Sequence, residues 1–448
     1  MQNLLSLTLI QFSNHWIFWQ PNVSVSISRF LTTFSDDFLQ SVSFEREQQR
    51  IVNSNMTDPV LIAAVEGGGT SFVVAVAELL PTGKTKILHR DEIDSSHDDP
   101  SLTLEECAAF FRKHKSISKQ EYAALGVAMF GPLGCDPQVP NEYGTILPTT
   151  PKKSWRGVDV LSPLVAACQS KSSPQTLAVK IDTDVNAPAV AEYLSEKEET
   201  TSEKKEISSL AYVTVGTGVG VGLVIHGEPV HGRMHPEGGH VPVQPLEGDA
   251  FTGYSWGANS KNPFQGKHTV ESMTSSVALT ERLEQLQNDA SAKLSRNCLA
   301  DLDDDDHEVW VHAANALANL CVTLALITSV EKIVLGGGIM KRNGLIEKVR
   351  TQTRVLLNGY LGDLSDQDLT EWITLSKHGS DAGLVGALSL AQQAMAEQKE
   401  GPSGDATNSS KKIKQIAYNA GLKHGFILGL SAAYIGIMMY VRRSSGRR

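Results

Sequence analysis

Three glycine-rich turns, each at the end of a short apolar run, constrain the fold of this chain more than any other sequence feature. The turns are Gly67–Thr70, Gly216–Gly220 and Gly336–Gly338. Glycine lets backbone amides approach a phosphate chain more closely than residues with side chains do. One such turn is equally typical of an ordinary hairpin. Three of them at the ends of predicted strands favour a fold in which strand ends converge on bound phosphates.

From Pro59 onward, apolar runs typical of buried strands alternate with helical stretches. Strands are predicted at Val60–Val65, Phe72–Leu79, Ala123–Met129, Leu177–Ile181, Ser209–Val215 and Lys332–Leu335, and helices at Thr103–Lys113 and Ala187–Tyr193. This alternation predicts an α/β fold with layered sheets flanked by helices. A chain of 448 residues has room for two or three domains.

Glu308–Val330 is a long apolar stretch whose length alone would allow it to span a membrane. It contains His312, Asn315 and Asn319 and leads directly into a predicted strand, so we expect a buried core helix. The charged insert Ser195–Glu206 is predicted to be a surface loop.

Residues 1–57 form a leader that differs in composition from the rest of the chain. Its first part holds one basic residue, Arg29, whereas a secretory signal requires a basic n-region and a transit peptide several arginines. We expect this leader to be disordered or to lie outside the fold. Translation from Met56 is one explanation, and an N-terminal membrane anchor is the alternative.

The C-terminal residues consist of a predicted linker, 398–415, and a hydrophobic tail, 416–448. The tail is uncharged from Gly425 to Val441, enough for a helix of about 25 Å, against a hydrocarbon core of about 30 Å. Basic residues flank it on both sides. We predict a membrane tail anchor, with a docked or interfacial helix as the alternative.

The net charge of -10 argues against nucleic acid as the main partner, because phosphate-backbone binding requires basic surfaces. The five cysteines are odd in number and scattered, which is typical of a reducing compartment.

Asp184 is the candidate catalytic carboxylate. It follows the predicted strand Leu177–Ile181 and precedes a helix, and ligand crevices of α/β sheets form at such strand ends. A carboxylate there can accept the proton of a hydroxyl nucleophile. Asp is equally common as a helix N-cap, so the local sequence leaves both roles open. In the first glycine turn, Thr70 offers a hydroxyl donor and Glu66 could hold a magnesium-bound water.

Seven segments of the chain occur in the order in which the ROK family of sugar kinases carries them. They are Glu66–Thr70, Phe130–Pro132, Thr183–Ala187, Gly216–Gly220, His235–His240, Gly336–Met340 and Gly379–Gly386. The chain most resembles the bacterial fructokinase branch, through Tyr143–Ile146, Thr150–Lys152 and Trp155. The resemblance covers roughly Pro59 to Gln393.

The resemblance implies an actin-like ATPase fold, with two RNase H-like domains and an active-site cleft between them. The N-terminal domain would be 58–182, completed by a C-terminal helix at 383–397, and the C-terminal domain would be 183–382. It implies phosphorylation of a hexose by ATP and Mg²⁺, most specifically of fructose to fructose 6-phosphate.

Residue roles follow from the same resemblance. Asp184 is the expected general base. Sugar contacts are expected at Gly131, Pro132, Asn186, Glu237, His240 and Glu271, and nucleotide contacts at Gly68, Gly69, Thr70, Gly216, Thr217, Gly218, Gly336, Gly337 and Gly338. His226 and His231 are interpreted as structural or exposed.

Two alternatives to a fructokinase remain open. One is a kinase of mannose, glucose or N-acetylmannosamine, and the other is a membrane-tethered sugar sensor without turnover. DNA binding is disfavoured, because no helix pair of the ROK repressor type precedes Pro59. A cytoplasmic catalytic part is expected, alone or as a homodimer, with the tail as a tether to a cytosol-facing organelle membrane.

The chain departs from the family at its structural zinc site. Where relatives of this type have two cysteines with a histidine between them, the segment Asn262–His268 has lost all three, and its one histidine is His268. His240 and His268 cannot fill the four positions of a structural zinc site, so we expect none there.

Overall fold

The computed structural model describes residues 8–12, 15–19, 58–95, 99–169, 176–199, 206–254, 261–286 and 298–399. The chain divides into two compact units, one of residues 60–78 and 86–448, and one of residues 1–59 and 79–85. In the smaller unit, β1 (Thr8–Phe12) and β2 (His15–Trp19) pair as an antiparallel hairpin, so this stretch of the predicted leader has regular structure. The predicted anchor, Gly425–Val441, lies outside the described residues.

The first five-stranded sheet has the order β5-β4-β3-β6-β7. Its strands are β3 (Val60–Gly67), β4 (Ser71–Leu79), β5 (Thr85–Asp94), β6 (Tyr122–Met129) and β7 (Ala178–Thr183). The strands β3, β6 and β7 are parallel. Every residue of β6 is buried, as expected for a central strand that is covered on both faces.

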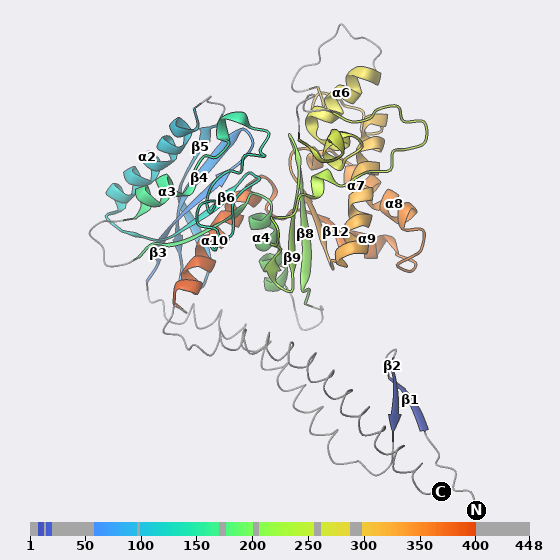
Figure 1. The fold of residues 1–448 in the computed structure, drawn as a ribbon, viewed down its shortest axis with the longest axis horizontal. Coiled ribbons are helices and arrows are strands. Elements are labelled where there is room, and N and C mark those ends of the chain that lie inside the picture. The colour runs from blue at the N-terminus through green and yellow to red at the C-terminus, as the bar shows by residue number, and fades with distance from the viewer. Residues whose placement is uncertain are drawn as a thin grey trace, which may run out of the picture. The chain divides into compact units, whose positions relative to one another are not determined.

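Helices cover both faces of the first sheet (Figure 1). They are α2 (Pro100–Ser118) and α3 (Leu161–Cys168) on one face and α10 (Ala382–Lys399) on the other. Alternation along β6 explains this arrangement, because successive side chains of a strand point to opposite faces. Leu125 and Val127 pack in the cluster with α2 and α3, whereas Gly126 lies against α10.

The second sheet has the order β10-β9-β8-β11-β12. Its strands are β8 (Ser209–Val215), β9 (Val219–Ile225), β10 (Glu228–Pro229), β11 (Ile333–Gly336) and β12 (Ile373–Leu375). An antiparallel hairpin joins β8 to β9, and β8, β11 and β12 are parallel. Both sheets are therefore mixed, which confirms the predicted α/β class.

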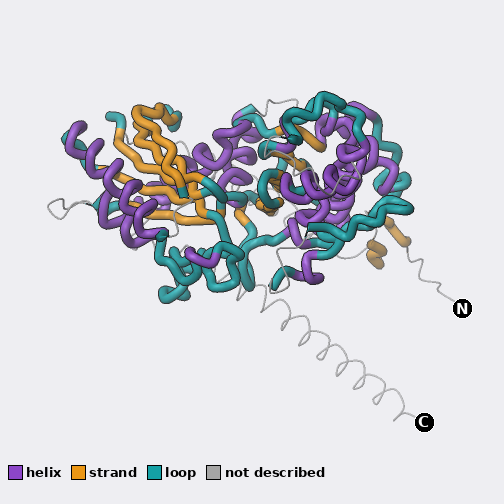
Figure 2. The backbone as a smooth tube through the Cα atoms, turned by 90° about the horizontal axis from the view of Figure 1, so that it is seen from above, coloured by secondary structure: helices purple, strands orange, loops and turns teal. Residues whose placement is uncertain are grey.

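Helices also flank the second sheet, and Figure 2 shows its strands among them. They are α4 (Asn186–Glu198) on one face and α7 (Glu308–Thr328) and α8 (Leu345–Leu357) on the other, with α5 (Val270–Thr274), α6 (Ser276–Leu286) and α9 (Asp366–Trp372) beside them.

The helix α7 confirms the core helix that was predicted at Glu308–Val330. Among the described residues it is the one helix long and apolar enough to cross a membrane, and 56% of its most apolar window is buried. Trp310, Leu317 and Cys321 lie in the core beneath the second sheet. Its length therefore reflects packing inside the protein.

The structure corrects the sequence analysis at two kinds of position. The helix α4 continues through Glu198, so the predicted loop Ser195–Glu206 begins as helix, because Glu and Lys are good helix formers and Glu196 is buried in an ion pair with Lys332. The edge strand β5 was not predicted, since most of its residues are exposed and it lacks an apolar run. The first residues of the predicted linker, Gln398 and Lys399, are also helical. The domain boundary at 182/183 stays a prediction.

We predict that Gly386→Ala destabilises the fold. A Cβ at Gly386 in α10 would lie 2.5 Å from the backbone carbon of Ala187 in α4, and backbone cannot move aside as a flexible side chain can. Overpacking costs ~1–3 kcal/mol, which exceeds the gain of about 1 kcal/mol that Ala has over Gly in a helix. Urea denaturation measures the difference.

Gly232→Ala is the matched control, because a Cβ there meets nothing within 4 Å. If both variants unfold at the same urea concentration as the parent chain, the close contact between α10 and α4 does not limit stability.

Candidate active site

One pocket of about 630 Å³ brings together the three glycine turns and Asp184. Of the residues singled out in the sequence, its lining includes Glu66, Gly68, Gly69, Thr70, Asp184, Gly216, Thr217, Gly218, Glu271, Gly336, Gly337 and Gly338. The turns join β3 to β4, join β8 to β9 and follow β11, so strand ends of both sheets meet at the pocket. All of these residues lie in the larger compact unit.

Asp184 is placed by the junction between β7 and α4. Its backbone N–H donates to the Met129 carbonyl over 2.9 Å, which continues the pairing of β7 with β6. The first helical amide, that of Asn186, donates to Thr183 Oγ1 over 3.0 Å. The first amide of α4 is therefore satisfied by Thr183 and not by Asp184, whose residue lines the pocket.

Burial raises the pKa of Asp184 to about 6, and the nearby ammonium group of Lys152 opposes that rise. Burial also raises the pKa of Glu66 to about 7, with further increases from the charges of Asp184, Asp381 and Glu92. Two carboxyl groups with raised pKa thus share one end of the pocket. Such a pair gains free energy from any cation that binds between or beside them.

Lys152 is a site residue that sequence reasoning missed. Its Nζ lies 4.1 Å from the centre of the Phe130 ring and 3.5 Å from the Gly68 carbonyl oxygen, to which it donates. Burial lowers its pKa to about 8, while Asp184 acts in the opposite direction. The sequence signal was present, because Lys152 ends the Thr150–Lys152 motif, but that motif was given no role.

Glu66 lies against the first turn of α10. A Cβ at Gly383 would come within 2.1 Å of Glu66 Oε1, so glycine is required for this approach. The unpaired amides and partial positive charge of a helix N-terminus favour a carboxylate there. Arg90, which forms an ion pair of 2.9 Å with Asp381, lowers the pKa of Glu66 in part.

Glu271 holds the second glycine turn. Its Oε2 accepts a hydrogen bond of 3.0 Å from the Val219 amide, and a Cβ at Gly218 would lie 2.6 Å from the same oxygen. In this structure the Glu271 carboxylate therefore contacts the turn that was predicted to bind nucleotide.

Five predicted sugar contacts do not line this pocket. They are Gly131, Pro132, Asn186, Glu237 and His240. Asn186 is fully buried, and its side-chain amide bonds to the backbone, accepting from Leu223 N at 3.3 Å and donating to Val230 O at 3.4 Å. Its contact with a sugar stays a prediction.

Glu237 nevertheless lies close enough to Asp184 to be influenced by its charge, and His240 lies beside Glu237. Burial raises the pKa of Glu237 to about 7, with further increases from Glu271 and Asp184. His240 Nε2 is 3.9 Å from Glu237 Oε2. The cis peptide between Gly131 and Pro132 lies beside the His235 ring, whose Nε2 accepts from Leu133 N at 3.1 Å.

Residues 62–394 match the profile of the ROK family. The fructokinase of Zymomonas mobilis is 32% identical to this chain, over 75% of the chain and 97% of that protein. The structure of a ROK hexokinase from Thermus thermophilus superposes with a TM-score of 0.54 at 21% identity, over 76% of this chain and all of that one.

A ROK family glucokinase from Streptomyces griseus, solved with glucose and AMPPNP, gives a TM-score of 0.53 at 19% identity, covering 74% of this chain and 99% of that one. These likenesses confirm the predicted fold, that of the ROK hexokinases.

We predict that Glu66→Gln stabilises the ligand-free protein above pH 7. The pKa of this carboxyl group rises on folding from 4.5 to about 7. The folded protein therefore loses stability as the pH rises through that range, because the buried group must then carry a charge. Glutamine removes this penalty, so its advantage should grow by ~1–3 kcal/mol between pH 5 and pH 8. Urea unfolding at the two pH values measures it.

Glu78→Gln is the control, because it makes the same change of side chain on the neighbouring strand β4, outside the pocket lining. An advantage of Glu66→Gln that is equal at both pH values would contradict the prediction.

Proposed function

The chain belongs to the ROK family, and we propose from this membership that it is an ATP-dependent kinase of hexoses with fructose as its preferred sugar. The single observation that supports kinase chemistry most strongly is the pocket shared by Asp184 and the three glycine turns. The fructokinase relative, aligned over almost its whole length, supports the choice of sugar.

The glycine turns are proposed to bind the phosphates of ATP. Gly69 offers an amide and Thr70 a hydroxyl, and the turns at Gly216–Gly218 and Gly336–Gly338 bring further backbone to the pocket. The amides of Gly68 and Gly216 donate to Ser71 O and Gly218 O and hold the shape of their turns. Backbone amides can hold phosphates without a basic surface, in keeping with the acidic net charge. Glu271, which bonds the second turn, would fix its conformation.

Asp184 is proposed to act as the general base. The sugar hydroxyl oxygen attacks the γ-phosphorus, its proton moves to the Asp184 carboxylate, and the bond from the γ-phosphorus to the bridging oxygen breaks to release ADP. A carboxyl group with a pKa of about 6 is ionised at neutral pH and still basic enough to accept this proton. Glu237, His240, Gly131 and Pro132 would contact the sugar beside it.

Glu66 fits a role toward Mg²⁺, held through water. The fit rests on a carboxyl group whose pKa is raised by burial and by Asp184, an arrangement that a divalent cation would relieve. When bound, the ion would neutralise charge on the transferred phosphoryl group. Lys152 supplies a fixed positive charge beside Asp184 and the first glycine turn.

The catalytic part is proposed to work in the cytoplasm. The five cysteines are free, which is compatible with a reducing compartment. A membrane tether through Gly425–Val441 and a homodimer remain predictions.

We predict that Asp184→Asn lowers kcat by about 10²–10⁴-fold while sugar binding persists, because the amide keeps the shape of the side chain but cannot accept the proton. A coupled ADP-release assay measures kcat, and isothermal titration measures sugar binding. The control is the exposed Asp363→Asn. A variant that keeps the parent kcat would remove Asp184 from the chemistry.

We predict that fructose has a higher kcat/KM than mannose, glucose or N-acetylmannosamine in the same assay. A different preferred sugar would contradict the fructokinase proposal and leave hexose kinase activity standing. Binding of sugars without ADP release from any of them would instead identify a sensor.

A further inference from the structure

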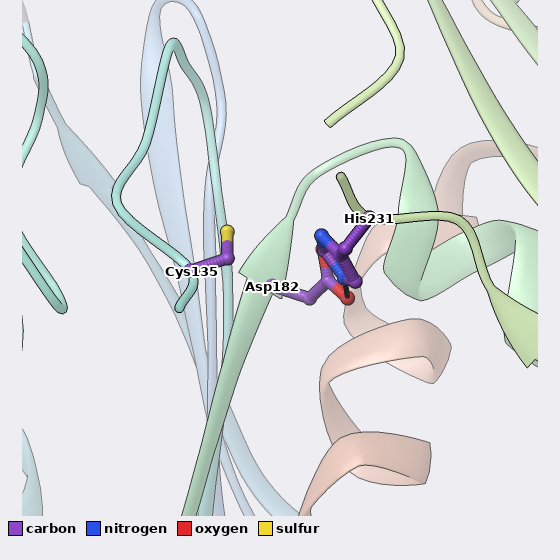
Figure 3. A group of neighbouring side chains, drawn as sticks. All are labelled: Cys135, Asp182 and His231. Carbon is purple, nitrogen blue, oxygen red and sulfur yellow. Dashed lines mark hydrogen bonds and ion pairs between the residues drawn. The ribbon is translucent and has the colours of Figure 1, made fainter. Parts of the chain in front are cut away.

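Cys135, Asp182 and His231 form a cluster outside the pocket (Figure 3). Their potential ligand atoms all lie within 4.8 Å of one another, and theirs is the one such group of three or more His, Cys, Asp or Glu side chains in the described ranges. Cys135 follows β6, Asp182 lies on β7, and His231 follows β10. From the sequence, His231 was expected to be structural or exposed, and Cys135 had no expected role.

The burial of the three side chains suits a site that opens to solvent on one side. The Asp182 side chain is 3% exposed, and its Oδ1 accepts from Thr183 N at 2.7 Å, which fixes the carboxylate. Its Oδ2 lies 2.9 Å from His231 Nε2. The His231 side chain is 37% exposed and free to adjust on the solvent side. Cys135 is the one cysteine of the five that is not buried.

We propose that Cys135, Asp182 and His231 bind a zinc ion, with water at the fourth position. A thiolate, an imidazole nitrogen and a carboxylate oxygen are the three donor types that zinc takes in proteins, at about 2.0–2.3 Å. Such bonds place ligand atoms roughly 3.3–3.8 Å apart. The cluster reaches this spacing if the contact between Asp182 and His231 widens slightly and the thiol moves inward.

The charges of the cluster balance those of the ion. His231 would bind zinc through Nε2 as the neutral imidazole that carries its hydrogen on Nδ1, and the Cys135 thiol would give its proton to solvent as the sulfur–zinc bond forms. One thiolate and one carboxylate then neutralise the two positive charges. Asp136, Lys180 and His235 are the other charged or titratable groups close enough to influence His231.

The site differs from the one at which relatives of the fructokinase type hold zinc. That site would use His240 and His268, and neither belongs to this cluster. Cys135 and Asp182 come from elements of the first sheet, whereas His231 comes from the second. A bound ion would therefore link the two sheets two residues from Asp184.

This link has a consequence that rests on the proposed kinase function. Kinases of this architecture close around their substrates, so an ion that ties the two sheets together beside the general base would restrict closure. Zinc at this site is expected to inhibit turnover reversibly, with activity restored by a chelator.

Cobalt titration of the full-length, metal-stripped protein tests the site directly. Cobalt bound by a thiolate gives a charge-transfer band, and zinc should displace it at one ion per chain. We expect the band in the parent protein and its loss in Cys135→Ala, with the affinity for zinc at least about 10-fold weaker in His231→Asn. Matched controls are Cys298→Ala and His226→Asn; Asn suits the left-handed backbone at His226.

A thiolate band that survives in Cys135→Ala would overturn the proposal. An unchanged zinc affinity in both Cys135→Ala and His231→Asn would also overturn it, because any zinc would then bind elsewhere. A second measurement separates the site from its consequence. Zinc should inhibit the parent kinase and not Cys135→Ala; binding without inhibition would refute the effect on closure alone. If no sugar is phosphorylated but the cobalt band behaves as expected, the zinc site stands and the proposed function fails.

Discussion

The close packing of α10 against β6 and α4 is the contact on which the rest of the structure depends. A Cβ at Gly126 of β6 would lie 1.9 Å from the Ala387 carbonyl oxygen, and one at Gly386 would lie 2.5 Å from the backbone of Ala187. One helix is thus held at backbone contact with an inner strand of the first sheet and with the helix that follows Asp184. Because α10 begins beside Glu66, the same packing also sets one end of the pocket.

The pocket concentrates carboxyl groups at a cost to stability. Burial raises the pKa of Glu66, Asp184 and Glu237. Acidic neighbours raise the pKa of Glu66 and of Glu237 further. Lys152 offsets part of this repulsion, but burial lowers its own pKa. A fold under no functional constraint would replace such groups with apolar ones, so their clustering in and beside one pocket is typical of a site that binds charged ligands.

The sequence predicted what is local and missed what depends on tertiary contacts. The glycine turns and the strands before them were predicted because both are encoded within a few residues. The local sequence left Asp184 open between a catalytic and a capping role, and only the structure shows that the first amide of α4 bonds to Thr183. Lys152 reaches the first glycine turn from 84 positions away, and His231 meets Asp182 across 49. No spacing rule reports contacts of that length.

The three consecutive residues at the end of β7 show how one junction can combine several constraints. Asp182 meets His231, Thr183 bonds the first amide of α4, and Asp184 lines the pocket. The Asp184 amide is itself tied to Met129 in β6. Because these contacts reach both sheets and the pocket from adjacent positions, a shift of one sheet relative to the other would strain this junction. Any group that fixes Asp182 to His231 would therefore act on Asp184, the proposed general base, without contacting it.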